Sequence, residues 1–217
     1  MIPMGARRDP LLVAGLGLAY GAFAHTFLGD REWFWQRMTN AGIVLGTLSL
    51  AGERSLRGDL RFDKKELALG LATAAGLYGI FQMGDRLARR IVPTGAEDIG
   101  DVYALDRLRP KSEIAARLAF VIGPAEELFW RGFVQRKLDR TNLGRWGAAA
   151  AAAAAYGGAH VVTRNVTLFG AASVAGAYWS ALAASGLSMG SLIVSHVAWD
   201  IWIFLVAPTA SGSSGRG

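Results

Sequence analysis

Long unbroken runs of apolar residues constrain this chain more than any other feature of its sequence. Several runs approach or exceed the ~18 to 20 residues that a helix needs to cross a bilayer. Hydrophobic residues make up 52% of the 217 residues and charged residues 18%, whereas soluble domains carry about 25% charged residues. The mean hydropathy is +0.28. The runs exclude a soluble globular domain and a disordered chain, and they predict a polytopic integral membrane protein.

The absence of cysteine and the distribution of the basic residues exclude several classes of function. The chain has no cysteine, which excludes a thiol nucleophile, cysteine-bound zinc, an iron–sulfur cluster and a disulfide framework. Its formal net charge is +6. Most of the basic residues lie in short loops between apolar runs, where topology signals and anionic lipid headgroups explain them. We therefore expect membrane lipid, and no nucleic acid, among the partners.

The runs predict an all-α fold, a transmembrane helix bundle of about seven spans (six to eight). The expected spans are residues 10–28, 33–52, 67–84, 114–134, 148–168, 169–187 and 188–207. We divide the chain into N-terminal transmembrane helices and loops (1–112), a catalytic bundle formed by the last four spans (113–207) and a flexible tail (208–217). Small residues in the fifth and sixth spans favour close helix packing, and we expect Gly157 to lie against a neighbouring helix.

Ionisable residues inside three of the spans are the strongest functional signal. A charge at the middle of a bilayer costs about 2.5 to 3.5 kcal/mol on insertion scales, so such residues are functional candidates. With a rise of about 1.5 Å per residue, Glu126, His160, His196 and Asp200 fall within about 4 Å of the middle of their spans. The full set is Glu126, Glu127 and Arg131 in the fourth span, His160 in the fifth, and His196 and Asp200 in the seventh. Three helices therefore deliver polar groups to one layer.

Spacing within the spans predicts two pairs. Glu127 and Arg131 are four residues apart on one helix face, so they can form an ion pair. His196 and Asp200 have the same spacing, so the carboxylate can hold the imidazole. Glu126 is rotated by about 100° from Glu127 and is free to face elsewhere.

These groups have the chemistry of a hydrolase that needs no serine or cysteine nucleophile. Glu126 and His160 could deprotonate water, and a protonated His196 could donate to a developing oxyanion. Other readings remain open at this point. Glu127 and Arg131 could form a purely structural ion pair, His160 could make a helix–helix hydrogen bond, and a transporter could use the same groups as a proton relay.

Three ordered motifs resemble those of the CPBP family, the CAAX prenyl endopeptidase type 2 and bacteriocin-processing (Abi) proteins. The segment P-A-E-E-L-F-W-R-G-F at 124–133 fits the signature E-E-x-x-x-R-G. The segment from Tyr156 to His160 fits F-x-x-x-H with Tyr in place of Phe, and the segment from His196 to Asp200 fits H-x-x-x-N or H-x-x-x-D. The resemblance covers about 113–207.

The resemblance implies a membrane-embedded endopeptidase that cuts protein or peptide substrates near a C-terminal, membrane-associated segment, whether lipidated or not. It implies that Glu126 and His160 activate water. It also implies that His196 and position 200 form the oxyanion site, and that Glu127 and Arg131 support the site. We expect the cytoplasmic membrane of a prokaryote as the location.

Two departures and two alternatives accompany this resemblance. An ionised Asp200 cannot stabilise an oxyanion directly, so we expect it to keep His196 charged, and Tyr156 adds a hydroxyl. We expect no cofactor, because the zinc hydrolase pattern H-E-x-x-H is absent. The alternatives are a zinc-dependent metalloprotease of the same family, with Glu126, His160 and His196 as ligands, and a non-catalytic peptide-binding or immunity scaffold.

Overall fold

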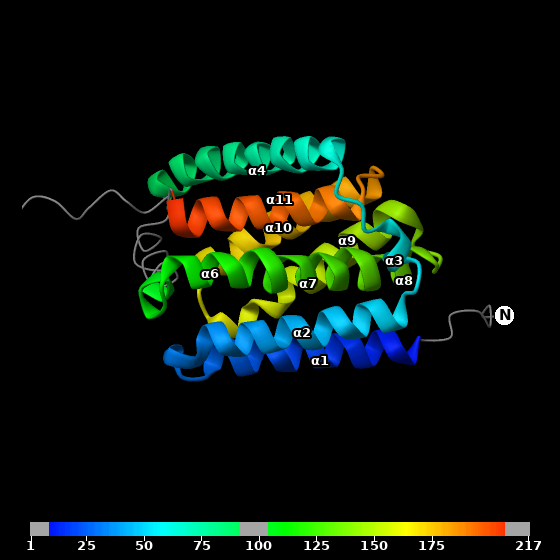
Figure 1. The fold of residues 1–217 in the computed structure, drawn as a ribbon, viewed down its shortest axis with the longest axis horizontal. Coiled ribbons are helices and arrows are strands. Elements are labelled where there is room, and N and C mark those ends of the chain that lie inside the picture. Colours follow the sequence, from blue (N-terminus) through cyan, green and yellow to red (C-terminus); the bar gives the residue numbers. More distant parts are fainter. Residues whose placement is uncertain (1–8, 92–103, 207–217) are drawn as a thin grey trace, which may run out of the picture.

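The computed structural model describes residues 9–91 and 104–206, and these residues form helices and turns without any strand. The expected all-α bundle is confirmed. Its helices run roughly parallel or antiparallel to one another along the long axis of the molecule (Figure 1). The predicted flexible tail, 208–217, lies outside the described residues.

The first two helices form an antiparallel hairpin on one side of the bundle (Figure 1). Helix α1 spans Pro10–Leu28 and helix α2 spans Phe34–Gly52, with a 3-10 turn, η1, at Arg31–Trp33 between them. Asp9 caps α1 because its carboxylate accepts a hydrogen bond from the Leu11 amide at 2.9 Å. Both helices match their predicted spans within a residue.

On the opposite side of the bundle, helix α4 (Lys64–Ile91) follows the short helix α3 (Leu56–Asp59). It packs along α11 (Met189–Ile201), which continues as the π-helical stretch η6 (Trp202–Val206). Figure 1 shows α4 on the outside of α11, at the edge of the bundle, and α4 also contacts α10 (Val166–Ala184), where the Tyr178 hydroxyl donates to the Thr73 carbonyl.

A long central helix lies between α2 and α11 and carries the first motif (Figure 1). A 3-10 turn, η2 (Ala104–Leu108), precedes it. Its consecutive segments are α6 (Lys111–Arg117), the π-helical η3 (Leu118–Ile122), α7 (Gly123–Glu127), the π-helical η4 (Leu128–Gln135) and α8 (Arg136–Asp139). We refer to Lys111–Asp139 as the central helix.

Pro124 gives a physical reason for the first π-helical stretch. It has no N–H group, and its ring crowds the carbonyl four residues earlier, so the α-helical hydrogen-bond pattern is interrupted. The Gly123 amide donates instead to the Leu118 carbonyl, five residues back. Such local widening is frequent at functional sites, and here it lies immediately before Glu126 and Glu127.

The boundary between the fifth and sixth spans was predicted wrongly. Helix α9 spans Gly144–Ala159, a 3-10 turn (η5, Val161–Thr163) follows, and α10 spans Val166–Ala184. The break at 160–165 reads H-V-V-T-R-N, and its polar residues lie inside the span that we predicted as continuous. Thr163 and Asn165 make the break: the Thr163 hydroxyl donates to the His160 carbonyl at 2.8 Å, and the Asn165 side chain caps α10 through the Leu168 amide at 2.7 Å.

The expected close packing of α9 and α10 is present. A Cβ atom placed on Gly157 would lie 2.5 Å from the Ser173 hydroxyl and 3.3 Å from its Cα. Only a glycine allows this approach without a shift of α10, which agrees with the role of small residues between membrane helices.

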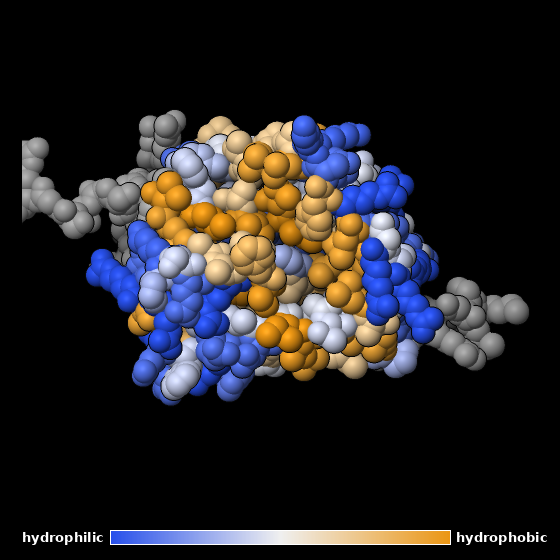
Figure 2. All heavy atoms as spheres, in the orientation of Figure 1, coloured by the Kyte–Doolittle hydropathy of each residue, from blue (hydrophilic) through white to orange (hydrophobic). Residues whose placement is uncertain are grey.

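Four of the described helices are long and apolar enough to cross a membrane: Pro10–Leu28, Lys64–Gly84, Val166–Ala184 and Met189–Val206. Hydrophobic residues gather over the middle of the face in Figure 2, and hydrophilic residues lie toward the ends of the bundle. This distribution fits an integral membrane protein. The count of about seven spans stays a prediction.

Candidate active site

The candidate site lies where the central helix approaches α11. A Cβ atom on Gly123 would be 2.8 Å from the Val197 side chain, so the missing side chain lets the two backbones come close. This contact places Glu126 and Glu127 opposite His196. All three side chains are buried within the bundle. The first and third motifs, far apart in the sequence, thus meet as expected.

His196 is held between carboxylates on both of its ring nitrogens. Its Nδ1 lies 2.6 Å from Glu127 Oε1. Its Nε2 lies 3.5 Å from Asp200 Oδ2 and 4.0 Å from Glu126 Oε2. An ionised carboxylate only accepts hydrogen bonds, so Nδ1 donates to Glu127. Glu127 therefore holds the imidazole, a role that the sequence reasoning gave to Asp200, and Asp200 lies beside the other nitrogen.

Arg131 forms the predicted pair with Glu127 and also ties the site to α10. Its Nη1 donates to Glu127 Oε1 at 2.9 Å, and its Nη2 donates to the Gly176 carbonyl at 3.2 Å. Both charged side chains are 0% exposed. Within the described residues, Glu127 Oε2 and Arg131 Nε have no hydrogen-bond partner. A buried network with unmet partners costs stability, so its presence favours a functional role.

The second motif reaches the site through Tyr156 and His160. The Tyr156 hydroxyl donates to Glu126 Oε2 at 2.9 Å. Nδ1 of His160 lies 3.0 Å from the Tyr156 carbonyl, and because a carbonyl only accepts, Nδ1 must carry the proton. Nε2 of His160 then has a free lone pair and can act as a base. His160 is the residue that follows α9, so it does not lie in the middle of a span as predicted.

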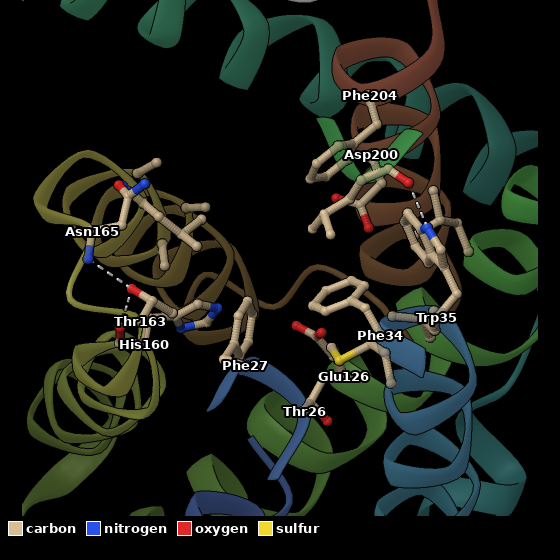
Figure 3. Close-up of a pocket in the computed structure, with 18 of the residues that line it drawn as sticks. Thr26, Phe27, Phe34, Trp35, Glu126, His160, Thr163, Asn165, Asp200 and Phe204 are labelled. Carbon is tan, nitrogen blue, oxygen red and sulfur yellow. Dashed lines mark hydrogen bonds between the residues drawn. The ribbon is translucent and has the colours of Figure 1, made fainter. Parts of the chain in front are cut away.

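One cavity of about 370 Å³ contains the reactive groups. Glu126, His160, His196 and Asp200 all line it, whereas Glu127 and Arg131 lie behind this wall. Figure 3 shows Glu126 and Asp200 on one side and His160 on the other, with Phe27 beside His160. Within the described residues, no direct hydrogen bond joins Glu126 and His160; each contacts Tyr156 instead.

Much of the rest of the cavity wall is apolar. It includes the aromatic side chains of Phe27, Phe34, Trp35, Trp199 and Phe204. The ring centroids of Phe27 and Phe34 are 5.3 Å apart, and those of Phe27 and His160 are 5.9 Å apart. The cavity can therefore hold a largely apolar group against one wall while polar atoms of the same molecule reach the carboxylates.

Comparison with protein families matches residues 112–202 to the model of the type II CAAX prenyl endopeptidase Rce1-like proteins. This segment contains all three motifs and every residue of the polar cluster. Over these residues, which we call the Rce1-like segment, the chain is similar to the Rce1-like family. Searches among curated proteins and among solved structures give no match. This similarity supports a membrane protease at the level of the family.

The zinc alternative can be compared with the side chains of the Rce1-like segment. Among the described residues, no three His, Cys, Asp or Glu side chains gather closely enough to hold a metal ion. Of the proposed ligands, Glu126 and His196 lie 4.0 Å apart, whereas His160 lies across the cavity from Glu126. These side chains do not fit a zinc ion in this arrangement, and we derive no step through a metal.

Sequence reasoning missed two contacts of the Rce1-like segment. The Trp179 ring stacks on His196 with centroids 4.0 Å apart and an interplanar angle of 16°. Trp179 lies in α10, outside the three motifs, so no motif spacing predicted this contact. The Glu127–His196 contact was also missed, because residues 69 positions apart can be paired only when the packing of the two helices is known.

Proposed function

We propose that this protein is a glutamate-type intramembrane endopeptidase. Its substrates are membrane-associated proteins or peptides, which it cleaves near their C-terminus, with or without an attached lipid. One observation carries the proposal: Glu126, His160 and His196 line a single cavity that also has an extended apolar wall. The polar groups suit hydrolysis of a peptide bond, and the apolar wall suits a membrane-associated substrate.

The proposed reaction begins with a water molecule bound between Glu126 and His160. Its oxygen bonds to the carbonyl carbon of the scissile peptide while its proton passes to one of these two bases. Negative charge develops on the carbonyl oxygen, where Nε2–H of the His196 imidazolium can stabilise it. The C–N bond then breaks and the proton passes to the leaving nitrogen. The products are a carboxylic acid and an amine.

The buried groups behind the cavity keep His196 ready for this role. Glu127 accepts from Nδ1, and Trp179 fixes the plane of the ring. Asp200 and Glu126 lie on the Nε2 side, where their negative charges favour a proton on that nitrogen. Arg131 in turn orients Glu127. An oxyanion donor fixed in this way needs little reorganisation during the reaction.

A charge-neutral variant tests the proposal. Glu126→Gln should lower cleavage of a quenched C-terminal reporter peptide in proteoliposomes by at least about 10³-fold, because it removes the base. Glu113→Gln is the matched control: it changes the same residue type on the same helix, at a partly exposed ion pair with Arg117, and should keep full activity. Equal activity of the two variants would overturn the glutamate mechanism.

Two further arms of this experiment address the alternatives. Activity should survive exhaustive chelation, whereas loss in chelator with recovery on adding Zn²⁺ would favour the metalloprotease. A wild-type protein that binds the reporter peptide without cleaving it would favour the peptide-binding scaffold. Reporters with and without a prenyl group distinguish whether the apolar wall selects for lipid. Comparing membrane peptides of a prokaryotic host with wild type or Glu126→Gln would test the natural substrate and its membrane.

A further inference from the structure

Tyr156 makes a contact that the family pattern does not provide. The motif that it begins is F-x-x-x-H in the resembling family, and phenylalanine has no hydroxyl. Here the hydroxyl donates to Glu126 Oε2 at 2.9 Å, inside the bundle. Hydrogen bonds to a charged group are stronger than those between neutral groups. The contact is therefore specific to the tyrosine in this chain and acts on the residue that we propose as the base.

The Tyr156 hydroxyl donates its hydrogen bond to only one of the two carboxylate oxygens of Glu126. Oε2 of Glu126 accepts the hydrogen bond from the Tyr156 hydroxyl and is also the oxygen that lies 4.0 Å from His196 Nε2. Within the described residues, no hydrogen bond to Oε1 of Glu126 is found. Because Glu126 lines the cavity, Oε1 is the oxygen left for a water molecule. A fixed carboxylate plane sets where that water is held.

The ring of Tyr156 contacts the supporting group as well. The Arg131 guanidinium carbon lies 4.8 Å from the ring centroid, a distance suited to a cation–π interaction. The ring also packs edge-on to Trp130, with centroids 5.5 Å apart and an angle of 76°. One side chain thus touches both Glu126 and the partner of Glu127, through different chemical groups.

We propose that Tyr156 is a positioning residue for the peptidase reaction, which orients Glu126 through its hydroxyl so that Oε1 faces the water and steadies Arg131 through its ring. This inference rests on the proposed function. The two contributions are separable, since Tyr156→Phe removes the hydroxyl alone and Tyr156→Leu removes the hydroxyl and the ring. Tyr178→Phe is the matched control, because its hydroxyl donates to the Thr73 carbonyl at 2.8 Å, away from the cavity.

The kinetic test separates positioning from substrate binding. Tyr156→Phe should lower kcat for the reporter peptide by about tenfold and leave KM within about twofold, because the water is misplaced while the substrate contacts remain. Tyr178→Phe should change neither. Tyr156→Leu should lower kcat further and also lower the melting temperature. An unchanged kcat in Tyr156→Phe, or a rise confined to KM, would overturn the positioning role.

An infrared measurement tests the hydrogen bond without using activity. The carboxylate stretching bands of Glu126 can be assigned from the difference between wild type and Glu126→Gln. They should move in Tyr156→Phe and stay in place in Tyr178→Phe, and bands that stay in place in both variants would overturn the contact. If neither the wild type nor any variant cleaves a reporter, the proposed function fails and the positioning role fails with it. A moved band would still establish the hydrogen bond.

Discussion

Two sets of ion pairs in this molecule differ in burial. The first is the buried cluster, Glu127, Arg131 and His196, in which each side chain is at most 3% exposed. The second joins the N-terminal helices and loop to the end of the central helix and its following turn. It consists of Asp9–Lys137, Asp59–Arg136 and Glu53–Arg140, with distances of 2.6, 2.6 and 2.7 Å.

Distance alone does not separate the two sets. The pairs at the helix end are as short as those of the buried cluster, but each has at least one side chain that is 30% exposed or more. Exposed pairs contribute about 0 to 1 kcal/mol because water screens them. Removing one member of a buried pair costs about 3 to 5 kcal/mol because the remaining charge stays desolvated. For ion pairs of equal length, burial therefore decides how much stability is lost when one partner is removed.

The largest expected effect comes from breaking the buried cluster. Arg131→Ala leaves Glu127 buried with a single partner and should lower the free energy of unfolding by about 3 to 5 kcal/mol. Denaturation with SDS in mixed micelles, followed by tryptophan fluorescence, measures this change. Arg136→Ala on the same helix is the control and should cost about 1 kcal/mol or less. Similar losses in the two variants would mean that burial does not distinguish the two sets.

Position 200 tests how far catalysis depends on groups around His196. Asp200→Ala should lower reporter cleavage by roughly 10²-fold, the scale of losing one oxyanion interaction. Asp200→Asn restores the commoner residue of the family motif and should keep much of the activity, since an amide can donate to the oxyanion directly. The measurement uses proteoliposomes with equal amounts of folded protein. Full activity in Asp200→Ala would remove this carboxylate from the proposed oxyanion site.

The smallest effect is expected at the helix end. Lys137→Ala removes the partner of Asp9 and should lower stability by about 1 kcal/mol or less at neutral pH. The hydrogen bond from Lys137 lowers the pKa of Asp9 below its usual value. A carboxyl whose pKa is lower in the folded state stabilises the fold at pH values above its unfolded-state pKa of about 4. This stabilisation is lost as the pH falls through the folded-state pKa.

The variant should therefore lose less stability than wild type when the pH falls below about 5. Melting temperatures of both proteins between pH 7 and pH 3 check this expectation. The contribution of Glu53 to stability should depend on pH in the same direction, because the hydrogen bond from Arg140 lowers the pKa of Glu53 too. Parallel pH curves for wild type and Lys137→Ala would show that the Asp9 contact contributes nothing to folding.

The sequence predicted those parts of the molecule that hydropathy and short spacing encode. The first two spans match α1 and α2, and the i,i+4 rule found the Glu127–Arg131 pair. The end of α9 was missed because the predicted span ran on through 160–165, where the side chains of Thr163 and Asn165 end one helix and begin the next. These polar residues were a usable signal, since Asn favours the N-cap of a helix.

Contacts between helices were only partly predictable. The three motifs placed Glu126, His160 and His196 in one layer, and the structure puts them around one cavity. No spacing rule showed that Glu127, rather than Asp200, would meet Nδ1 of His196. That choice depends on how the central helix and α11 are rotated about their axes, which is set by packing such as that of Gly123 against Val197.

The adjacency of Glu126 and Glu127 makes the site sensitive to axial rotation. Consecutive residues on a helix point about 100° apart, so one glutamate meets the contents of the cavity and the other meets protein alone. A twist of the central helix by one residue would exchange these two environments. The fully buried rings of Phe129, Trp130 and Phe133 follow directly in the next turns. Packing of these rings opposes such a rotation, which would otherwise turn Glu126 away from the cavity and Glu127 toward it.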